Sequence, residues 1–138
     1  MKSFRSFLIP LLEAEPGRCQ LQGSGRSEPI ARTLETAFDS AARRRGLLGR
    51  ERLEDGTALI IAPCGAIHTF SMRFPIDIIF AARNGTVLKT YTAVPPARIA
   101  FALRAHAAIE LPAGAVGRSG TRVGDVLAVV ARQRDARD

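Results

Sequence analysis

The clearest alternation of apolar and polar side chains in the sequence lies between Phe70 and Phe80. Every even-numbered position of this stretch is apolar, whereas the odd-numbered positions up to Asp77 are polar or proline. A two-residue period is typical of a strand that buries one face. Proline lacks the N–H that a strand ladder needs, so Pro75 predicts a bend between two short strands. His68 falls on the apolar side of the first strand.

Short apolar segments separated by turn residues predict further strands before and after this stretch. Asn84 and Gly85 lie between two such segments, and this pair is typical of a two-residue hairpin turn. One short helix is expected at residues 41–48, with Asp39 or Ser40 capping its start and Gly49 ending it. The other expected strands cover residues 30–38, 57–62, 86–93, 106–111 and 125–131.

These strands do not alternate with helices along the chain. Such an order favours a mainly β fold, a compact antiparallel β-sandwich or barrel with one short helix near its start. We expect residues 30–131 to form a single domain, residues 1–29 to form a flexible N-terminal arm and residues 132–138 to form a charged tail.

The N-terminal apolar run is too short for a convincing signal peptide. It covers residues 7–12 and is followed by Glu13, whereas a secretory signal normally contains roughly 7–15 apolar residues. No apolar run approaches the roughly 20 residues of a transmembrane helix. We therefore expect a cytoplasmic protein without a membrane span, and export stays open as the alternative.

The formal net charge of +7 raises the question of an anionic partner. Arginines concentrate around the expected helix and form a candidate anion-binding patch, which makes a weak nucleic-acid binder one alternative function. Aromatic residues make up only 6% of the chain, so a base-stacking platform is poorly supplied. A solvated helix face explains the patch more simply, and nucleic acid is the less favoured partner. The patch consists of Arg43, Arg44, Arg45, Arg50 and Arg52.

Neither cysteine predicts a metal site or a nucleophile. Cys64 and His68 have a spacing that would supply two metal ligands, but zinc needs three or four. We therefore predict no metal and no cofactor. A cysteine nucleophile would use His68 as its base and Asp77 as the orienting carboxylate. Four residues along a strand keep Cys64 and His68 apart unless Gly65 folds the chain back.

A polar cluster around the bend is the better candidate for a binding site. The planar guanidinium of arginine suits a carboxylate or a phosphate. The leading hypothesis is a non-enzymatic domain that binds a small anionic ligand or a partner protein through this surface. The alternatives are a structural salt bridge between Arg73 and Asp77, and a hydrolase with His68 as general base. The candidate residues are His68, Thr69, Arg73, Asp77 and Glu110.

Four segments, at residues 43–50, 67–77, 110–114 and 124–125, together resemble the signature of family 192 of the domains of unknown function. Their order and spacing match from about Ala31 to Val130. The resemblance implies a jelly-roll-like, mainly β domain with a small helix near its start, and it implies no established activity. The chain departs from the common pattern at Ser71, where an aromatic residue is usual, which weakens any inference of a stacking ligand there.

Overall fold

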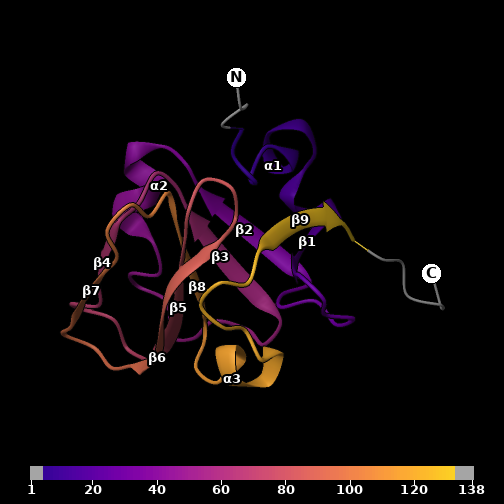
Figure 1. Cartoon of the computed structure of the whole chain (residues 1–138). Coiled ribbons are helices and arrows are strands. Elements are labelled where there is room, and N and C mark those ends of the chain that lie inside the picture. The colour runs from indigo at the N-terminus through magenta and orange to yellow at the C-terminus, as the bar shows by residue number, and fades with distance from the viewer. Residues whose placement is uncertain (1–4, 133–138) are drawn as a thin grey trace.

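The computed structural model describes residues 5–132 and is built mainly from short strands (Figure 1). Three short α-helices and one turn of 3-10 helix, η1, connect them. In chain order the elements are α1 (Pro10–Glu13), η1 (Pro16–Arg18), β1 (Cys19–Gly23), β2 (Thr33–Ala37), α2 (Ser40–Arg45), β3 (Thr57–Ile61), β4 (Ala66–His68), β5 (Ile76–Ala81), β6 (Val87–Val94), β7 (Ile99–Phe101), β8 (Ala107–Pro112), α3 (Ala115–Ser119) and β9 (Leu127–Ala131).

The strands form one five-stranded sheet and two small two-stranded sheets. The large sheet has the order β2-β3-β8-β5-β6, and the small sheets pair β1 with β9 and β4 with β7. The mainly β prediction is therefore confirmed. Two details differ from the expectation: the sheets of the described residues do not close into a barrel, and β2 runs parallel to β3. A parallel pair needs a long crossover, and residues 38–56 with α2 supply it.

Gly85 and Asp39 act as their chemistry predicts, whereas Asn84 does not take the positive φ expected in a two-residue hairpin turn. Asn84 and Gly85 connect β5 to β6, and Gly85 has a φ of 94°, which glycine adopts at little cost. A side chain at Gly85 would also overlap the carbonyl of Leu127. Asp39 caps α2 by accepting a hydrogen bond of 2.8 Å from the N–H of Ala42. The sequence predicted Gly49 as the end of this helix. In the structure α2 ends at Arg45, and Gly46 is its C-cap.

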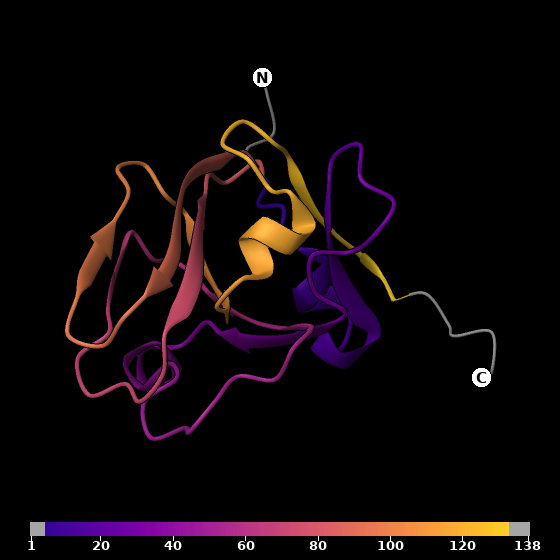
Figure 2. The ribbon, with the colours of Figure 1, turned by 90° about the horizontal axis from the view of Figure 1, so that it is seen from below.

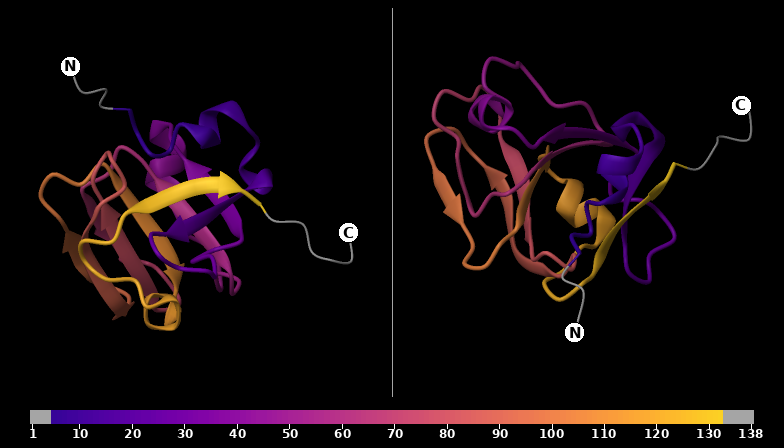
Figure 3. Two further views of the ribbon diagram at one scale, coloured as in Figure 1. Left: turned by 45° about the vertical axis from the view of Figure 1, so that its right-hand side comes forward. Right: turned by 90° about the horizontal axis from the view of Figure 1, so that it is seen from above.

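Two hydrophobic cores lie on opposite faces of the five-stranded sheet. The first includes Leu21, Ile60 and Ile109, and β1 and β9 cover it together with α1 and α3. The second includes Leu59, Ile78 and Phe80, and α2 and the β4–β7 sheet cover it. Figures 2 and 3 show the two small sheets on either side of the large one. The fold is therefore a layered arrangement in which each small sheet closes one core.

The segment expected to form an N-terminal arm packs against the domain over the part of residues 1–29 that the structure describes. Leu8 and Leu11 are buried in the first core, and β1 pairs with β9 from Cys19 to Gly23. Leu21 at the centre of β1 has no exposed surface. The apolar-polar alternation of β1 covers only residues 19–22, and β1 covers apolar surface that would otherwise face water. The predicted tail lies almost entirely outside the described residues.

Candidate functional site

The structure places Asp77 inside the fold, where it binds backbone rather than Arg73. Its carboxylate is fully buried and accepts hydrogen bonds from the N–H groups of Ala93 (2.8 Å), Gly114 (3.1 Å) and Val116 (2.9 Å). Arg73 is exposed, and its guanidinium lies 3.9 Å from the carboxylate of Glu51. The expected salt bridge between Arg73 and Asp77 therefore does not form. Asp77 instead ties β6 and α3 to β5.

Thr69 also has a structural environment. It is buried, and its hydroxyl donates to the carbonyl of Pro95 (2.7 Å) while accepting from the N–H of Arg98 (2.9 Å). The strand predicted at Phe70 does not form. Residues 69–75 are a loop instead, and Ser71 in it has a positive φ of 66°. Thr69 joins this loop to the residues that precede β7.

His68 faces solvent, which corrects the expectation that it faces the core. In β4 the inward-facing residue is Ile67, and His68 on the other side of the strand is exposed. The imidazole stacks on the ring of Phe70, with centroids 5.5 Å apart. In the described residues, no hydrogen bond joins His68 to a carboxylate. The geometry thus lacks the orienting acid that a general base would need.

Glu110 is the most unusual side chain of the predicted set. It is 3% exposed, and among the described residues its Oε2 is the buried side-chain oxygen without a hydrogen-bond partner. Its neighbours across the sheet are Leu59 and Ile78, both part of the second core. Burial raises its pKa from 4.5 to about 7, although the positive charge of Arg50 acts in the opposite direction. Burial therefore favours the protonated, neutral form of Glu110.

A second carboxylate lies on the same sheet face. Glu35 is opposite Leu59 in the register of β2 and β3, and Glu110 is opposite Leu59 from the other side. Arg50 donates two hydrogen bonds to Glu35, of 2.8 and 3.1 Å, and this pairing lowers the pKa of Glu35. The two acids and Arg50 thus form a charged edge to the second core. Sequence reasoning missed Glu35, because only the strand order brings it near Glu110.

Most of the arginine patch is occupied by contacts within the chain. Arg43 donates a 2.6 Å hydrogen bond to the carbonyl of Phe38, and Arg52 lies 2.8 Å from the carboxylate of Glu54. Arg50 binds Glu35 as described, while Arg44 and Arg45 are exposed. The patch therefore presents less free charge than the sequence suggests.

Cys64 is not arranged as a nucleophile. Its thiol donates to the carbonyl of Ala66 (3.2 Å), and burial raises its pKa, so the reactive thiolate is disfavoured. Across residues 5–132, no group of three or more His, Cys, Asp or Glu side chains is placed to hold a metal ion. Over the same residues, no helix is both long and apolar enough to cross a bilayer.

The outer face of the β4–β7 sheet carries a group of exposed apolar side chains that the sequence did not single out. We define the β4–β7 face as His68, Phe70, Ile99, Phe101 and Leu103. The four apolar members are 47%, 65%, 53% and 83% exposed, respectively. Their inward-facing neighbours Ile67 and Ala100 are buried in the second core. Residues 99–101 are all apolar, so no alternation in the sequence marked them as a strand with one exposed side.

Tyr91 and Lys89 of β6 contact Phe101 in this face. The hydroxyl of Tyr91 donates to the Phe101 carbonyl (2.8 Å) and accepts from its N–H (3.2 Å). The ammonium of Lys89 donates to the same carbonyl (3.1 Å) and lies 4.6 Å from the centroid of the Phe101 ring. A cation over an aromatic ring adds further attraction. The backbone of Phe101 is thus anchored to β6 by three hydrogen bonds.

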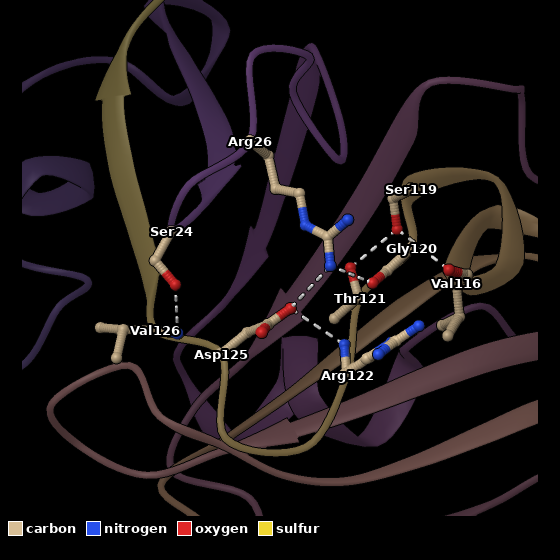
Figure 4. Close-up of polar contacts among 9 residues, drawn as sticks. All are labelled: Ser24, Arg26, Val116, Ser119, Gly120, Thr121, Arg122, Asp125 and Val126. Carbon is tan, nitrogen blue, oxygen red and sulfur yellow. Dashed lines mark hydrogen bonds and ion pairs between the residues drawn. The ribbon is translucent and has the colours of Figure 1, made fainter.

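The polar network around α3 is a structural one (Figure 4). Asp125 accepts from the N–H of Arg122 (3.0 Å), and its carboxylate lies 3.5 Å from the guanidinium of Arg26. Arg26 also donates to the carbonyl of Gly120 (2.5 Å). These contacts join the loop between β1 and β2 to the turn before β9, which agrees with the role of Asp125 as a turn residue.

Comparison with known proteins adds a family and a fold. A family model described as "Uncharacterized ACR, COG1430" matches residues 20–129. No curated protein matches the chain. A protein of unknown function from Novosphingobium aromaticivorans is 24% identical, with a TM-score of 0.70 over 78% of this chain and 82% of its own. A Sinorhizobium meliloti protein described as a "putative transcription regulator" is 24% identical, with a TM-score of 0.71 over 80% and 91%. At this identity the likeness concerns the fold alone.

Proposed function

Since the chain belongs to the DUF192 family, whose description carries no activity, we propose a function from the geometry alone. We propose that the protein is a non-enzymatic module that binds a partner protein through the β4–β7 face. The observation that supports this proposal is the exposure of four large apolar side chains, two in strand β7 and two in the turns that follow β4 and β7. Contiguous exposed apolar groups on a folded domain typically mark an interaction surface.

The charge around the face defines the kind of partner. The two segments that build this region, residues 63–76 and 84–109, contain no aspartate or glutamate. They contain Arg73, Lys89, Arg98 and Arg104, of which the three arginines are exposed, and Arg73 lies 3.9 Å from the carboxylate of Glu51. A second copy of this chain would bring a basic rim against a basic rim. A polypeptide with apolar side chains flanked by acidic ones is complementary both to the apolar side chains of the face and to the positive charges around it.

The contacts that anchor Phe101, three backbone hydrogen bonds and the Lys89 ammonium over its ring, favour binding over catalysis. An aromatic side chain that is already ordered loses little conformational freedom when it is covered, so more of the contact energy contributes to affinity. Aromatic residues are common energetic centres of interfaces. No complete set of nucleophile, base and orienting acid accompanies the face in the described residues.

A random peptide library displayed on phage, selected on the purified domain, tests the proposal. The retained peptides should combine aromatic or aliphatic residues with aspartate or glutamate, and their binding should weaken with salt. Ile99→Asp should abolish retention, because it places a charge in the centre of the face. Val123→Asp is the matched control, since Val123 is 63% exposed in the turn before β9.

Two results would overturn the proposal. One is a selection in which Ile99→Asp retains the same peptides as the unchanged domain. The other is a domain that retains no peptide but sediments with phosphatidylserine vesicles. That result would mean that the face binds a membrane surface.

A further inference from the structure

A cavity of about 230 Å³ lies on the opposite side of the five-stranded sheet from the β4–β7 face. Its walls are the loop before β2, the turn before β3, the end of β8 and α3. Ile30, Leu111 and Ala115 supply apolar lining, and all three belong to the first core. The cavity is therefore separate from the surface proposed to bind a partner protein.

Contacts within the chain join two walls of this cavity. Arg26, in the loop before β2, donates to the carbonyl of Gly120 directly after α3, at 2.5 Å (Figure 4). Ser119 of α3 lines the cavity, and its hydroxyl lies 2.7 Å from that of Thr121. The hydroxyl of Ser119 is therefore already used within the chain, and other polar groups must provide the contacts to a ligand.

The hydroxyl of Thr57 is available for such a contact. Thr57 begins β3, lines the cavity and is 8% exposed. Across residues 5–132, no hydrogen bond involves its side chain. In the same residues the fully covered side-chain oxygen without a partner is Oε2 of Glu110, so Oγ1 of Thr57 is not fully covered. Because the rest of Thr57 is buried, this oxygen is accessible from the cavity.

The charged groups at the mouth of the cavity balance one another. The carboxylate of Asp55 lies 3.8 Å from the guanidinium of Arg118, and both side chains are exposed. The carboxylate of Glu28 lies 3.4 Å from the guanidinium of Arg32. Neither pair has a net charge, so an added ion of either sign gains little. The carboxylate oxygens can still accept, and the guanidinium N–H groups can still donate, further hydrogen bonds.

We propose that this cavity binds one pyranose ring of a neutral sugar, either free or at the end of a glycan. A sugar hydroxyl both donates and accepts, so it binds Asp55 and Arg118 without disturbing their balance of charge. The hydroxyl of Thr57 forms a further hydrogen bond, and the C–H face of the ring lies against Ile30 and Leu111. Concave apolar sites with a few converging polar groups are the usual form of small-molecule sites.

The size of the cavity restricts the ligand to one ring. Sites for drug-sized molecules usually occupy roughly 300–1,000 Å³, whereas this cavity has about 230 Å³. A second ring of a glycan therefore lies outside the cavity, near the exposed side chains of Glu28 and Asp55.

Glucose, galactose and mannose and their α- and β-methyl glycosides are the probes, added to isotopically labelled protein and followed by NMR. At least one should shift the amide resonances of Gly56, Thr57, Ala115 and Ser119. Equal affinity for a free sugar and its methyl glycoside would indicate the end of a glycan, and binding of the free sugar alone would indicate a free one. Cyclohexanol should bind at least about tenfold more weakly, because it offers only one hydroxyl. If none of the sugars binds, the inference is wrong.

The variant Thr57→Val removes the hydroxyl and keeps the shape of the side chain. It should weaken sugar binding by about fivefold or more, because one hydrogen bond is lost. The free energy of unfolding should not fall, since the hydroxyl has no partner among the described residues. Thr90→Val is the matched control, because Thr90 is half-buried in β6 and does not line the cavity. Equal sugar binding by Thr57→Val and the unchanged protein would contradict the inference.

Charged analogues of the bound sugar test its assignment as a neutral ligand. The uronate and the amino sugar with the same ring should bind no more tightly than the neutral sugar, and salt should leave the affinity for the neutral sugar unchanged. A uronate that binds about tenfold more tightly would show that Arg118 is free for an anion, and the assignment would then be wrong.

The position of the shifted resonances separates this inference from the proposed function. Shifts at Ile67 and Phe101, without shifts at Thr57 and Ala115, would place the sugar on the β4–β7 face and overturn the inference. The proposed binding of a partner protein does not depend on the cavity, so it would survive that result.

Discussion

Replacing Glu110 with glutamine should change how the stability of the fold depends on pH. The pKa of this carboxyl rises from 4.5 in the unfolded chain to about 7 in the fold, because the group is buried without a full set of partners. Between these two values the unfolded chain has released the proton and the folded chain still holds it. The free energy of unfolding therefore falls as the pH rises from 4.5 to 7, and this loss is complete above pH 7.

The magnitude follows from the pKa difference. Each unit corresponds to about 1.4 kcal/mol, so the rise to about 7 amounts to about 3 kcal/mol. Glutamine has nearly the same shape and no proton to release. The stability of Glu110→Gln relative to the unchanged protein should therefore increase by about 3 kcal/mol between pH 4.5 and pH 8. Taking the difference between two proteins cancels the contributions of the other titrating groups.

Urea unfolding followed by circular dichroism, at several pH values, measures this difference, since the chain contains no tryptophan. Glu13→Gln is the control, because Glu13 is exposed on α1 and its replacement should leave the pH dependence close to that of the unchanged protein. If the curves of Glu110→Gln and the unchanged protein run parallel, the reasoning is refuted. In that case Arg50 or a buried water stabilises the ionised carboxylate as well as bulk water does.

Four further changes test the structural assignments by urea unfolding. Asp77→Ala should lower the free energy of unfolding by about 3 kcal/mol or more, because it leaves three N–H groups without their acceptor, and a change below about 1 kcal/mol would contradict this role. Leu21→Ala should lower the free energy of unfolding by about 2–5 kcal/mol, since the side chain is fully buried; an unchanged free energy would indicate that β1 is only loosely attached to the domain. Thr69→Val should cost about 1–2 kcal/mol through its lost hydrogen bonds, and no cost would remove Thr69 as a link between the loops. Arg50→Lys should cost at most about 1 kcal/mol, because the pair with Glu35 is about 40% exposed, and a larger loss would show a tighter coupling to Glu110.

The polar cluster predicted around the bend had members of different kinds. His68 and Arg73 are exposed near the proposed binding surface, whereas Thr69 and Asp77 are buried and bind backbone groups. The sequence placed all four within ten residues, but it could not show which side chains would face water. Burial depends on the segments that pack against each residue, and those segments lie elsewhere in the chain.

Local chemistry was enough to predict those features that depend on a few neighbouring residues. The sequence by itself determined the position of the β5–β6 hairpin, because Gly85 adopts the positive φ of its turn at little cost. It determined the start of α2 through the capping carboxylate of Asp39. The mainly β class followed from short apolar segments between turn residues.

Only the tertiary structure decided how these elements combine. The order β2-β3-β8 brings Glu35 and Glu110 to either side of Leu59, although 75 positions separate the two acids in the chain. The same packing pairs β1 with β9 and leaves Ile99 and Phe101 uncovered. Pairing between distant strands is set by which apolar faces can be buried together, and no local period of the sequence encodes that choice.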